Sequence, residues 1–446
     1  MRFKTTETDM LHGPLAPKLL RFTLPIALSS ILQQLFNAAD TAIVGSFGDA
    51  DALAAVGTNT EIIALIVTLS SGLSIGANLL VAARIGQGRR SELPDAARTA
   101  VLLSVFVGLL GLALGQRAAL PLLRLIRTPE SILRAAETYL RIYLLGYPFL
   151  LLYDFGSAVL RARGDSRFPF LALAVSGIVN VGLNLVFVLA FRMGVAGVAA
   201  ATGLSTLLSA LLVLRRLARD GQFRLSLRGP RLSLPYAAEI LGAGLPAAVQ
   251  GAVFCLANLF VQASVNRFGE TAIAGSTVAM SFEYLTYYII TAFGQTATTF
   301  TGQNYAAGQE ERCGRVLRLC LGLSTVCSAV PIFTIVLFRG FFAGLFTPEE
   351  AVIESAGVRI LCILLFEPLC NLYEIPAGAL RGRGHSLYPA VGTMLGTCVF
   401  RIVWIETVFR RCPTLPVLYR AFPLSWLATI VLVNAGFLLA RRAEKG

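Results

Sequence analysis

The chain has 446 residues, of which 56% are hydrophobic and only 14% are charged, and its mean hydropathy is +0.71. Globular proteins are nearer to about 45–50% apolar and about 25% charged residues. So few charges exclude a soluble protein of this length, including a soluble helical repeat protein, whose helices would need polar faces. The net charge of +13 could indicate nucleic-acid binding, but the basic residues lie between apolar segments, where they indicate membrane topology instead.

Apolar stretches that could cross a membrane recur along the whole chain. A transmembrane helix needs roughly 20 mostly apolar residues. The sequence predicts about twelve such helices, at 17–47, 52–83, 97–116, 137–160, 168–191, 194–218, 237–266, 271–303, 314–338, 354–380, 387–409 and 416–440. The predicted fold class is therefore all-α, a polytopic membrane protein with about twelve transmembrane helices in two six-helix bundles. The predicted parts are an N-terminal lobe at 17–218 and a C-terminal lobe at 237–440, joined by a cytoplasmic linker at 219–236. Cytoplasmic tails are predicted at 1–16 and 441–446.

The positions of Lys and Arg predict the orientation of the chain. If the N-terminus is cytoplasmic, most of these residues fall on the cytoplasmic side, for example in 84–90, 161–167 and 215–231. This bias agrees with the positive-inside rule. A few arginines, such as Arg124 and Arg127, fall outside, but the opposite orientation fits much worse. We therefore expect a multi-pass protein of the inner (plasma) membrane with both termini cytoplasmic, the lipid bilayer as a partner and no nucleic acid.

The two halves of the chain are related in sequence. Residues 160–169 read LRARGDSRFP and residues 380–389 read LRGRGHSLYP, and upstream of them Asp154 corresponds to Glu374. Each half contains six predicted helices, an even number, so the second half enters the membrane from the same side as the first. The repeats are therefore parallel, an arrangement found in transporters that work by alternating access. Since Asp154 and Glu374 each precede an arginine by seven residues, we favour an architectural role for this pair.

Asp40 is the most informative polar residue in a predicted helix, because an acidic side chain inside a bilayer marks a functional site by default. Gln33 and Asn37 precede it on one face of the same helix. The rise per residue places Asn184 and Thr202 at about the depth of Asp40. Their oxygen atoms could surround Na⁺, or Asp40 alone could carry a proton, or amide hydrogen bonds to Asp40 could simply hold the helices together. The candidate cation-coupling residues are Asp40, Asn37, Asn180, Asn184 and Thr202.

The second half lacks these polar residues, since Val261 stands at the position of Asp40, and Phe400 and Trp404 at those of Asn180 and Asn184. Any cation site is therefore predicted in the N-terminal lobe. The C-terminal lobe has its own buried acids, namely Glu283, Glu367, Glu374 and Glu406, and Arg401 is a candidate partner for one of them. Glu283 lies in an aromatic stretch, FEYLTYY, which could line a cavity for an organic cation, although core packing explains the aromatic residues equally well. The candidate substrate-cavity residues are Gln33, Gln34, Asn258, Glu283, Tyr284, Tyr287 and Glu374.

Several segments resemble one family of transporters. The run LPIALSSILQQLFNAADTAIVGSFGDADALAAVG at 24–57 is similar to the first two helices of the multidrug and toxic compound extrusion (MATE) family. The segments GLSIGANLLVAARIGQG at 72–88, ALRGRGHSLYP at 379–389 and FRIVWIETVF at 400–409 resemble it too, so that the resemblance covers nearly the whole chain. It implies a twelve-helix, two-lobe antiporter that exports organic, often cationic, compounds in exchange for Na⁺ or H⁺.

In prokaryotic members of this family, an aspartate of the first helix joins polar residues of the fifth and sixth helices in a cation site. These positions match Asp40, Asn180, Asn184 and Thr202. Asn184 stands where many members carry a second aspartate, which leaves Asp40 as the lone carboxylate, so both H⁺ and Na⁺ stay open as the coupling ion.

We therefore predict a secondary active transporter that exports organic, cationic and amphipathic compounds in antiport with H⁺ or Na⁺. We expect that the protein is not an enzyme, because the sequence contains no P-loop, H-E-x-x-H or G-x-S-x-G motif. We also expect a monomer without a cofactor and without a metal other than Na⁺ at Asp40. Two alternatives stay open. One is a flippase of lipid-linked saccharides or precursors from the same wider superfamily, which would carry a strongly cationic cavity. The other is a non-transporting membrane scaffold, against which the duplication and the Asp40 residues argue.

Overall fold

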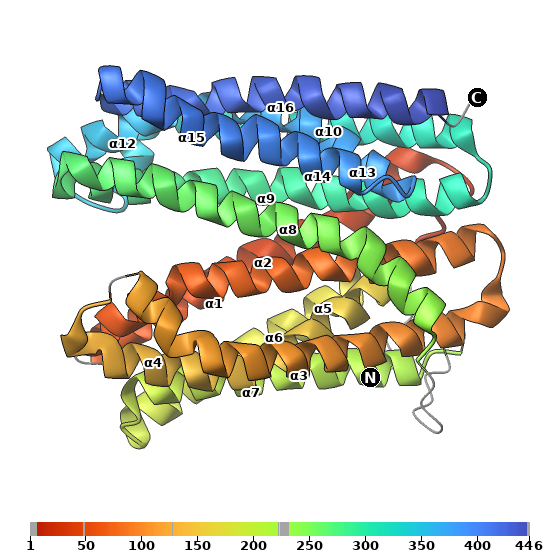
Figure 1. The fold of residues 1–446 in the computed structure, drawn as a ribbon, viewed down its shortest axis with the longest axis horizontal. Coiled ribbons are helices and arrows are strands. Elements are labelled where there is room, and N and C mark those ends of the chain that lie inside the picture. The colour runs from red at the N-terminus through yellow and green to blue at the C-terminus, as the bar shows by residue number, and fades with distance from the viewer. Residues whose placement is uncertain (1–6, 48–49, 127, 222, 224–231, 444–446) are drawn as a thin grey trace. The chain divides into compact units, whose positions relative to one another are not determined.

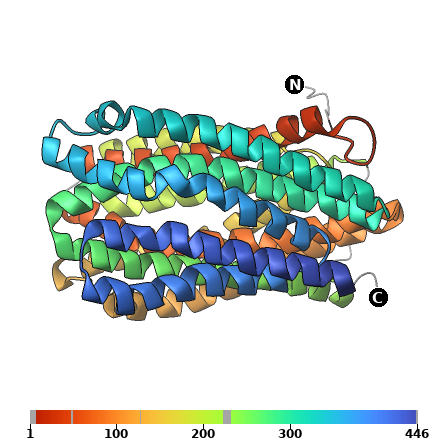
Figure 2. The ribbon, with the colours of Figure 1, turned by 90° about the horizontal axis from the view of Figure 1, so that it is seen from above.

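The computed structural model describes residues 7–47, 50–126, 128–221, 223 and 232–443. Every regular element in these ranges is a helix, and long helices run side by side within each half of the chain (Figures 1 and 2). The α-helices are α1 (Leu15–Phe47), α2 (Ala50–Gly86), α3 (Leu93–Leu125), α4 (Glu130–Leu145), α5 (Tyr147–Ala162), α6 (Arg167–Leu185), α7 (Gly194–Ala218), α8 (Leu234–Val265), α9 (Glu270–Ala306), α10 (Glu310–Leu337), α11 (Arg339–Gly344), α12 (Glu350–Cys362), α13 (Asn371–Gly382), α14 (Leu387–Thr393), α15 (Phe400–Trp404) and α16 (Leu415–Ala443). Short 3₁₀ or π-helical segments are η1 (Arg90–Glu92), η2 (Val186–Ala190), η3 (Asn266–Phe268), η4 (Leu364–Cys370), η5 (Met394–Val399) and η6 (Ile405–Phe409).

In the described residues, nine helical segments are long and apolar enough to cross a membrane, and the bent pair α4 and α5 makes ten. The two other predicted spans, 271–303 and 354–380, coincide with α9 and with the series α12, η4 and α13. Threonine, Gln and Asn residues fill the second half of α9, and η4 contains Glu367 and Pro368, so both segments are less apolar than the rest. The prediction of an all-helical fold is confirmed.

The predicted span 137–160 is longer than expected and is not one straight helix. It consists of α4 and α5, which meet at Gly146 at an angle of 43°. Pro148 lies in the first turn of α5 and has no backbone N–H to continue the hydrogen bonding of α4. The amides of Phe149 and Leu150 bond instead to the Gly146 carbonyl, both at 3.0 Å. The bend therefore follows from the proline and the glycine before it.

The ends of α5 and α13 show the internal repeat in three dimensions. Gly164 follows α5 with φ +99°, and Gly384 follows α13 with φ +89°. Two backbone hydrogen bonds recur at each end. The glycine N–H donates to the carbonyl of the arginine three residues before it, Arg161 or Arg381, at 2.9 Å. The N–H of the residue after the glycine donates to the carbonyl of Leu160 or Leu380 at 3.0 Å. This is the Schellman pattern, in which a left-handed residue closes the helix and glycine has no Cβ penalty. The two R-x-R-G segments, 161–164 and 381–384, therefore end their helices in the same way.

Contacts divide the chain into two units. The first consists mainly of Leu24–Ala248 and the second of Val249–Gly446, to which Met10–Thr23 also belongs. The division differs from the predicted lobes, because the beginning of α1 packs in the second unit, where Phe22 lies edge-on to Phe300 with ring centroids 5.4 Å apart. Likewise, the first half of α8 packs in the first unit rather than starting the second.

Glycines on α2 bring α8 into the first unit. A Cβ at Gly76 would collide with the Ile240 carbonyl oxygen, and a Cβ at Gly72 would meet the backbone of Ala248 at 2.5 Å. Gly244 on α8 faces the Leu73 backbone in the same way. Small residues let two membrane helices approach backbone to backbone, so the glycine positions place this part of α8 against α2.

We expect Gly76→Ala to lower the free energy of unfolding by about 1–3 kcal/mol, because the added methyl group must displace a backbone atom rather than a flexible side chain. Thermal unfolding of the purified protein in detergent would measure this change. Gly314→Ala on α10 is the matched control, since no atom lies within 4 Å of its added Cβ. Equal stability of the two variants would contradict the close approach of α2 and α8.

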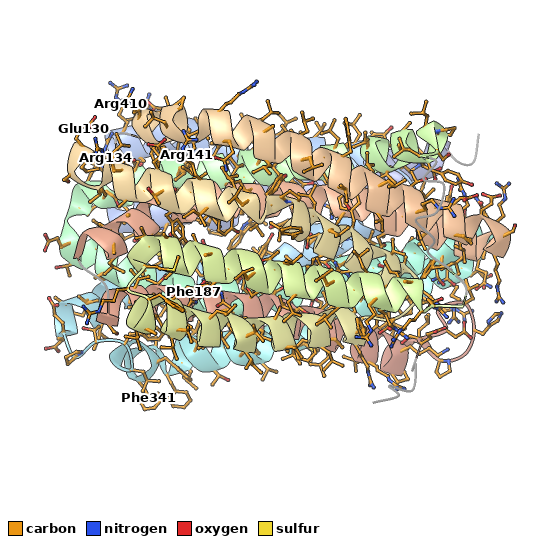
Figure 3. The ribbon with its side chains drawn as sticks, turned by 90° about the horizontal axis from the view of Figure 1, so that it is seen from below. Glu130, Arg134, Arg141, Phe187, Phe341 and Arg410 are labelled. Carbon is orange, nitrogen blue, oxygen red and sulfur yellow. The ribbon has the colours of Figure 1, made fainter. Side chains whose placement is uncertain are left out.

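Charged side chains gather at the helix ends, and apolar side chains fill the interior of each unit. On α4, Glu130 and Arg134 lie at one end of the first unit, and Arg141 follows further along the helix (Figure 3). Arg141 pairs with Glu137 at 2.7 Å. The main apolar clusters include Leu80, Phe155, Val213 and Ile240 in the first unit, and Val265, Ile290, Leu380 and Leu418 in the second.

Candidate functional site

Four of the five residues predicted to couple a cation lie together in the first unit. Asn184 on α6 donates from Nδ2 to Asp40 Oδ1 at 2.5 Å and to Asn180 Oδ1 at 3.2 Å. Thr202 Oγ1 on α7 lies 3.2 Å from Asp40 Oδ2 and 3.0 Å from the Val198 carbonyl, and it accepts from Asn180 Nδ2 at 3.4 Å. Three helices, α1, α6 and α7, therefore converge on one carboxylate.

The site is buried and rich in oxygen atoms. Asp40 is 7% exposed, Asn180 4% and Asn184 0%. Asn184 Oδ1 is buried and accepts no hydrogen bond within the described part of the chain. A buried acceptor without a donor is costly, whereas carboxylate, amide and hydroxyl oxygens are the ligands that hard cations prefer. The residues therefore fit a small hard cation, whose binding would use this orphaned oxygen.

The backbone changes directly after Asn184. Helix α6 ends at Leu185 and continues as the π-helical segment η2. Single π-helical turns inside α-helices occur frequently at functional sites. The wider turn lies next to an apolar cluster that includes Val44, Val188 and Val198, so the polar residues have an apolar neighbourhood.

Asn37 does not join the Asp40 residues, contrary to the prediction. It is exposed, and no hydrogen bond in the described residues links its side chain to Asp40. Three residues turn a helix by about 300°, which leaves Asn37 about 60° away from Asp40 around α1. Gln33 is half-buried about two turns away, and Gln34 is exposed. Spacing therefore places these residues near the face of Asp40, but in the described part of the chain it is Asp40 that bonds to Asn184 of α6 and Thr202 of α7.

A second group of predicted residues surrounds a cavity of about 110 Å³ in the second unit. Asn258, Glu283, Tyr284 and Tyr287, all candidates for a substrate cavity, lie in its wall. The wall is completed by apolar and aromatic side chains and by three further charged residues, namely Arg359, Glu367 and Arg401. Its wall comes from α8, α9, the series α12, η4 and α13, and the pair α15 and α16.

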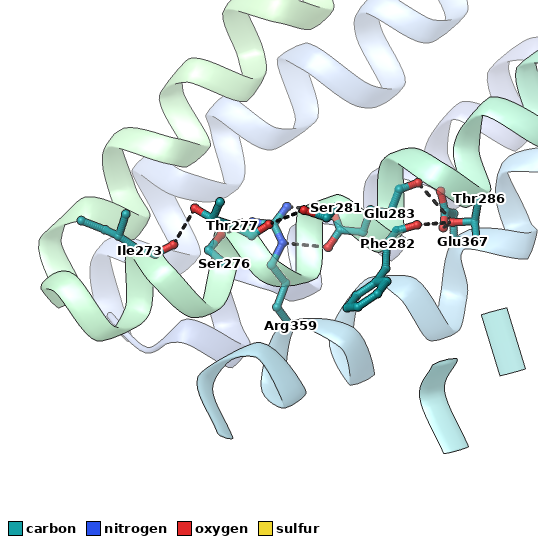
Figure 4. A network of polar contacts seen from close by, with 9 residues as sticks. All are labelled: Ile273, Ser276, Thr277, Ser281, Phe282, Glu283, Thr286, Arg359 and Glu367. Carbon is teal, nitrogen blue, oxygen red and sulfur yellow. Dashed lines mark hydrogen bonds and ion pairs between the residues drawn. The ribbon is translucent and has the colours of Figure 1, made fainter. Parts of the chain in front are cut away.

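Glu283 is not a free carboxylate in this cavity. Arg359 donates two parallel bonds to it, Nε to Oε1 at 2.7 Å and Nη2 to Oε2 at 2.8 Å, and a third bond to Ser276 Oγ at 2.6 Å (Figure 4). The two charged side chains are 5% and 13% exposed. Close by, Thr286 donates to Glu367 at 2.5 Å. Because Glu283 is already neutralised, the predicted attraction of an organic cation to this residue loses its main support.

Glu374 and Glu406 lie elsewhere. Glu374 pairs with Arg381 at 3.7 Å and packs against Gly294 of α9, and it is absent from the cavity wall. This geometry agrees with the architectural role favoured for it. Glu406 is wrongly predicted as buried: its side chain is 67% exposed and lies 3.9 Å from Arg410. It faces outward from the last turn before the helix end, which hydropathy does not reveal.

Arg359 and Glu61 are charged residues of predicted spans that are not among the predicted site residues. Arg359 lies near the start of the span 354–380, yet it is only 4% exposed. Glu61 lies within α2 and is exposed. A search for every charged residue inside a predicted span would have found both, because a charge in a bilayer is costly wherever it occurs.

The family model MatE matches residues 25–186 and 246–405, once in each half of the chain. The chain belongs to the MatE family. It is 30% identical over 400 residues to the Bacillus subtilis protein named "Probable multidrug resistance protein YpnP", covering 88% of each chain. It is 24% identical over 392 residues to a protein of Shewanella oneidensis named "FAD transporter", covering 83% of this chain and 85% of that protein. Its fold is similar to the structure of a MOP superfamily transporter from Pyrococcus furiosus, with a TM-score of 0.88, 23% identity and coverage of 99% and 98%.

These findings confirm the predicted family and the two-lobe membrane fold. The double match of the MatE model coincides with the internal repeat, since one match falls in each half of the chain. Members of the family are membrane transporters, so the MatE chain is a transporter rather than a scaffold or an enzyme.

Proposed function

We propose that this MatE protein exports amphipathic organic compounds, organic cations among them, in exchange for Na⁺ or H⁺ that binds at Asp40. The observation that carries the proposal is the convergence of α1, α6 and α7 on one buried carboxylate with an unpartnered amide oxygen beside it. The name of the relative YpnP supports organic compounds as substrates. The proposed location is the inner membrane with both termini cytoplasmic, as the positions of Lys and Arg indicate.

Binding of the ion at Asp40 can be linked to the conformation of the helices around it. A cation or a proton neutralises the carboxylate and changes which groups Asn184 and Thr202 bond. A ligand shifts a conformational equilibrium only by its difference in affinity for the two states. Since three helices supply the residues of the site, a movement between them changes the affinity for the ion, which is what alternating access needs.

Transport in liposomes would test this function. The purified protein is reconstituted with a fluorescent organic cation inside, and Na⁺ and H⁺ gradients are imposed separately, with an ionophore collapsing the other gradient. We expect one of the two gradients to drive efflux above the rate of protein-free liposomes. If neither gradient moves the dye and the protein instead transfers lipid-linked saccharides between leaflets, the flippase alternative replaces the proposal.

We expect Asn184→Asp to raise the apparent Na⁺ affinity of efflux at least about tenfold. The change adds a second negative charge within contact distance of the ion, where two unit charges at 4 Å interact by about 4 kcal/mol at an effective dielectric constant of 20. The initial rate of efflux as a function of Na⁺ concentration measures this. An unchanged Na⁺ dependence in a folded variant would mean that Na⁺ does not bind beside residue 184.

A further inference from the structure

The cavity of the second unit contains a positive charge that is not neutralised by an ion pair. Arg401 on α15 is 1% exposed and lines the cavity. It donates from Nε to Ser425 Oγ and from Nη1 to Asn258 Oδ1, both at 3.1 Å. Both acceptors are neutral, and among the described residues the other buried arginines of this unit, namely Arg359, Arg381 and Arg383, each pair with a glutamate.

The guanidinium of Arg401 is held in place but not saturated. Phe422 lies 4.0 Å and Phe254 5.6 Å from its central carbon, measured to the ring centroids. Such contacts offset part of the desolvation of a buried cation. A guanidinium has five N–H donors in a planar fork, and in the described part of the chain only two donor groups have acceptors. A buried charge without a charged partner is strongly unfavourable, so a bound anion would stabilise this arrangement.

The other charges of the cavity do not fill this role. Glu283 already forms two bonds with Arg359, and Glu367 accepts the Thr286 hydroxyl proton. The internal repeat strengthens the contrast between the two halves. Val261, which corresponds to Asp40, also lines the cavity, so the position that is negatively charged in the first unit is apolar in the second. The positive charge of Arg401 stands one residue after the counterpart of Asn180.

We propose that this cavity binds the carboxylate of a small aromatic compound, with Arg401 holding the carboxylate and the ring packing against Tyr284, Tyr287 and Trp426. The planar fork of arginine matches carboxylate and phosphate oxygens bidentately, and a carboxylate is the smaller of the two groups. A cavity of about 110 Å³ is smaller than the roughly 150 Å³ that accept benzene, so binding of a single-ring carboxylate requires side chains of the wall to move. The inference deepens the proposed function, on which it rests, by naming a class of substrate beyond organic cations.

Three probes with the same ring test the proposal on the unaltered protein: para-fluorobenzoate, para-fluorobenzylammonium and para-fluorobenzyl alcohol. Broadening of the fluorine NMR signal is measured in lipid nanodiscs with the protein and in empty nanodiscs. We expect saturable binding of the carboxylate and at least about tenfold weaker binding of the other two. Equal binding of the alcohol or the ammonium compound would overturn the proposal, whether or not any variant folds.

Substitutions at three positions locate the site. The chain has 2 Trp, and Trp426 is the one in the cavity wall, so in a Trp404→Phe protein the remaining fluorescence reports this cavity and should change on binding of para-fluorobenzoate. Arg401→Gln should weaken that binding at least about tenfold. The matched control Arg410→Gln, which removes an arginine whose side chain is 80% exposed, should leave it unchanged. Equal affinity of the Arg401→Gln and Arg410→Gln proteins would refute the role of Arg401.

Binding is measured without a gradient, so its outcome is separable from transport. Loss of carboxylate binding with dye efflux intact refutes the inference alone. Carboxylate binding without any gradient-driven efflux supports the site and refutes the proposed transport function.

Discussion

Asp40→Asn is expected to reduce ion-driven efflux to the rate of protein-free liposomes. The substitution removes the negative charge but keeps the shape of the side chain, so the contacts with Asn184 and Thr202 can persist while neither Na⁺ nor H⁺ has a carboxylate to bind. An acidic residue in a membrane helix is expensive and is retained for such work. Efflux of a fluorescent organic cation under separate Na⁺ and H⁺ gradients measures the loss, with protein amount and thermal stability determined in parallel.

The control for this experiment is Glu137→Gln. Glu137 belongs to the same unit and pairs with Arg141 at a partly exposed position, so the variant removes an equal charge away from Asp40. It should transport at nearly the rate of the unaltered protein. Normal transport by a folded Asp40→Asn protein would show instead that Asp40 only holds α1 against α6 and α7, and the assignment of the coupling site would fail.

Arg359→Met is expected to lower the free energy of unfolding by about 3–5 kcal/mol, because it leaves the buried carboxylate of Glu283 without its partner. The double variant Arg359→Met with Glu283→Gln should recover most of the loss, since an apolar side chain beside a neutral amide carries no uncompensated charge. Thermal and chemical unfolding of the purified proteins in detergent would measure both changes.

The exposed pair Arg315 and Glu311 provides the comparison. Its side chains are 62% and 92% exposed, so Arg315→Met should cost at most about 1 kcal/mol, as surface ion pairs do. If the double variant in the cavity is as unstable as Arg359→Met alone, then lost packing against the Tyr419 and Phe422 rings, rather than an unpaired charge, explains the effect.

Much of the first-unit site could be predicted, because a helix converts spacing into depth. Asp40, Asn184 and Thr202 were placed at one level from the rise per residue, and the structure shows their side chains in contact. Depth does not determine direction, however. Asn37 is exposed while Asp40 is buried, because α6 and α7 contact α1 at Asp40 and leave Asn37 uncovered. The coupling role of these residues stays a prediction.

In the second unit, the sequence predicts the residues of the cavity but not how their charges pair. Its aromatic and acidic residues could be named from the sequence, but not the pairing of Glu283 with Arg359, which are far apart in the chain. That pair changes the chemistry of the cavity, because it neutralises the Glu283 carboxylate. Among the described residues it leaves Arg401 and Glu367 as the cavity charges without an ion-pair partner, with Glu367 bonded to Thr286. Charges in contact across helices depend on packing, which hydropathy does not describe.

The sequence by itself determined the helical membrane fold, the duplication, the family and the identity of the candidate carboxylate in the first half. These follow from local properties: the length of apolar runs, the cost of a charge in a bilayer and the recurrence of residues between halves. Only the tertiary structure decided the bend between α4 and α5, the place of α8 in the first unit and the partners of each buried charge. Those features depend on which backbone surfaces meet, and single glycines such as Gly76 determine this through contacts with residues far away in the chain.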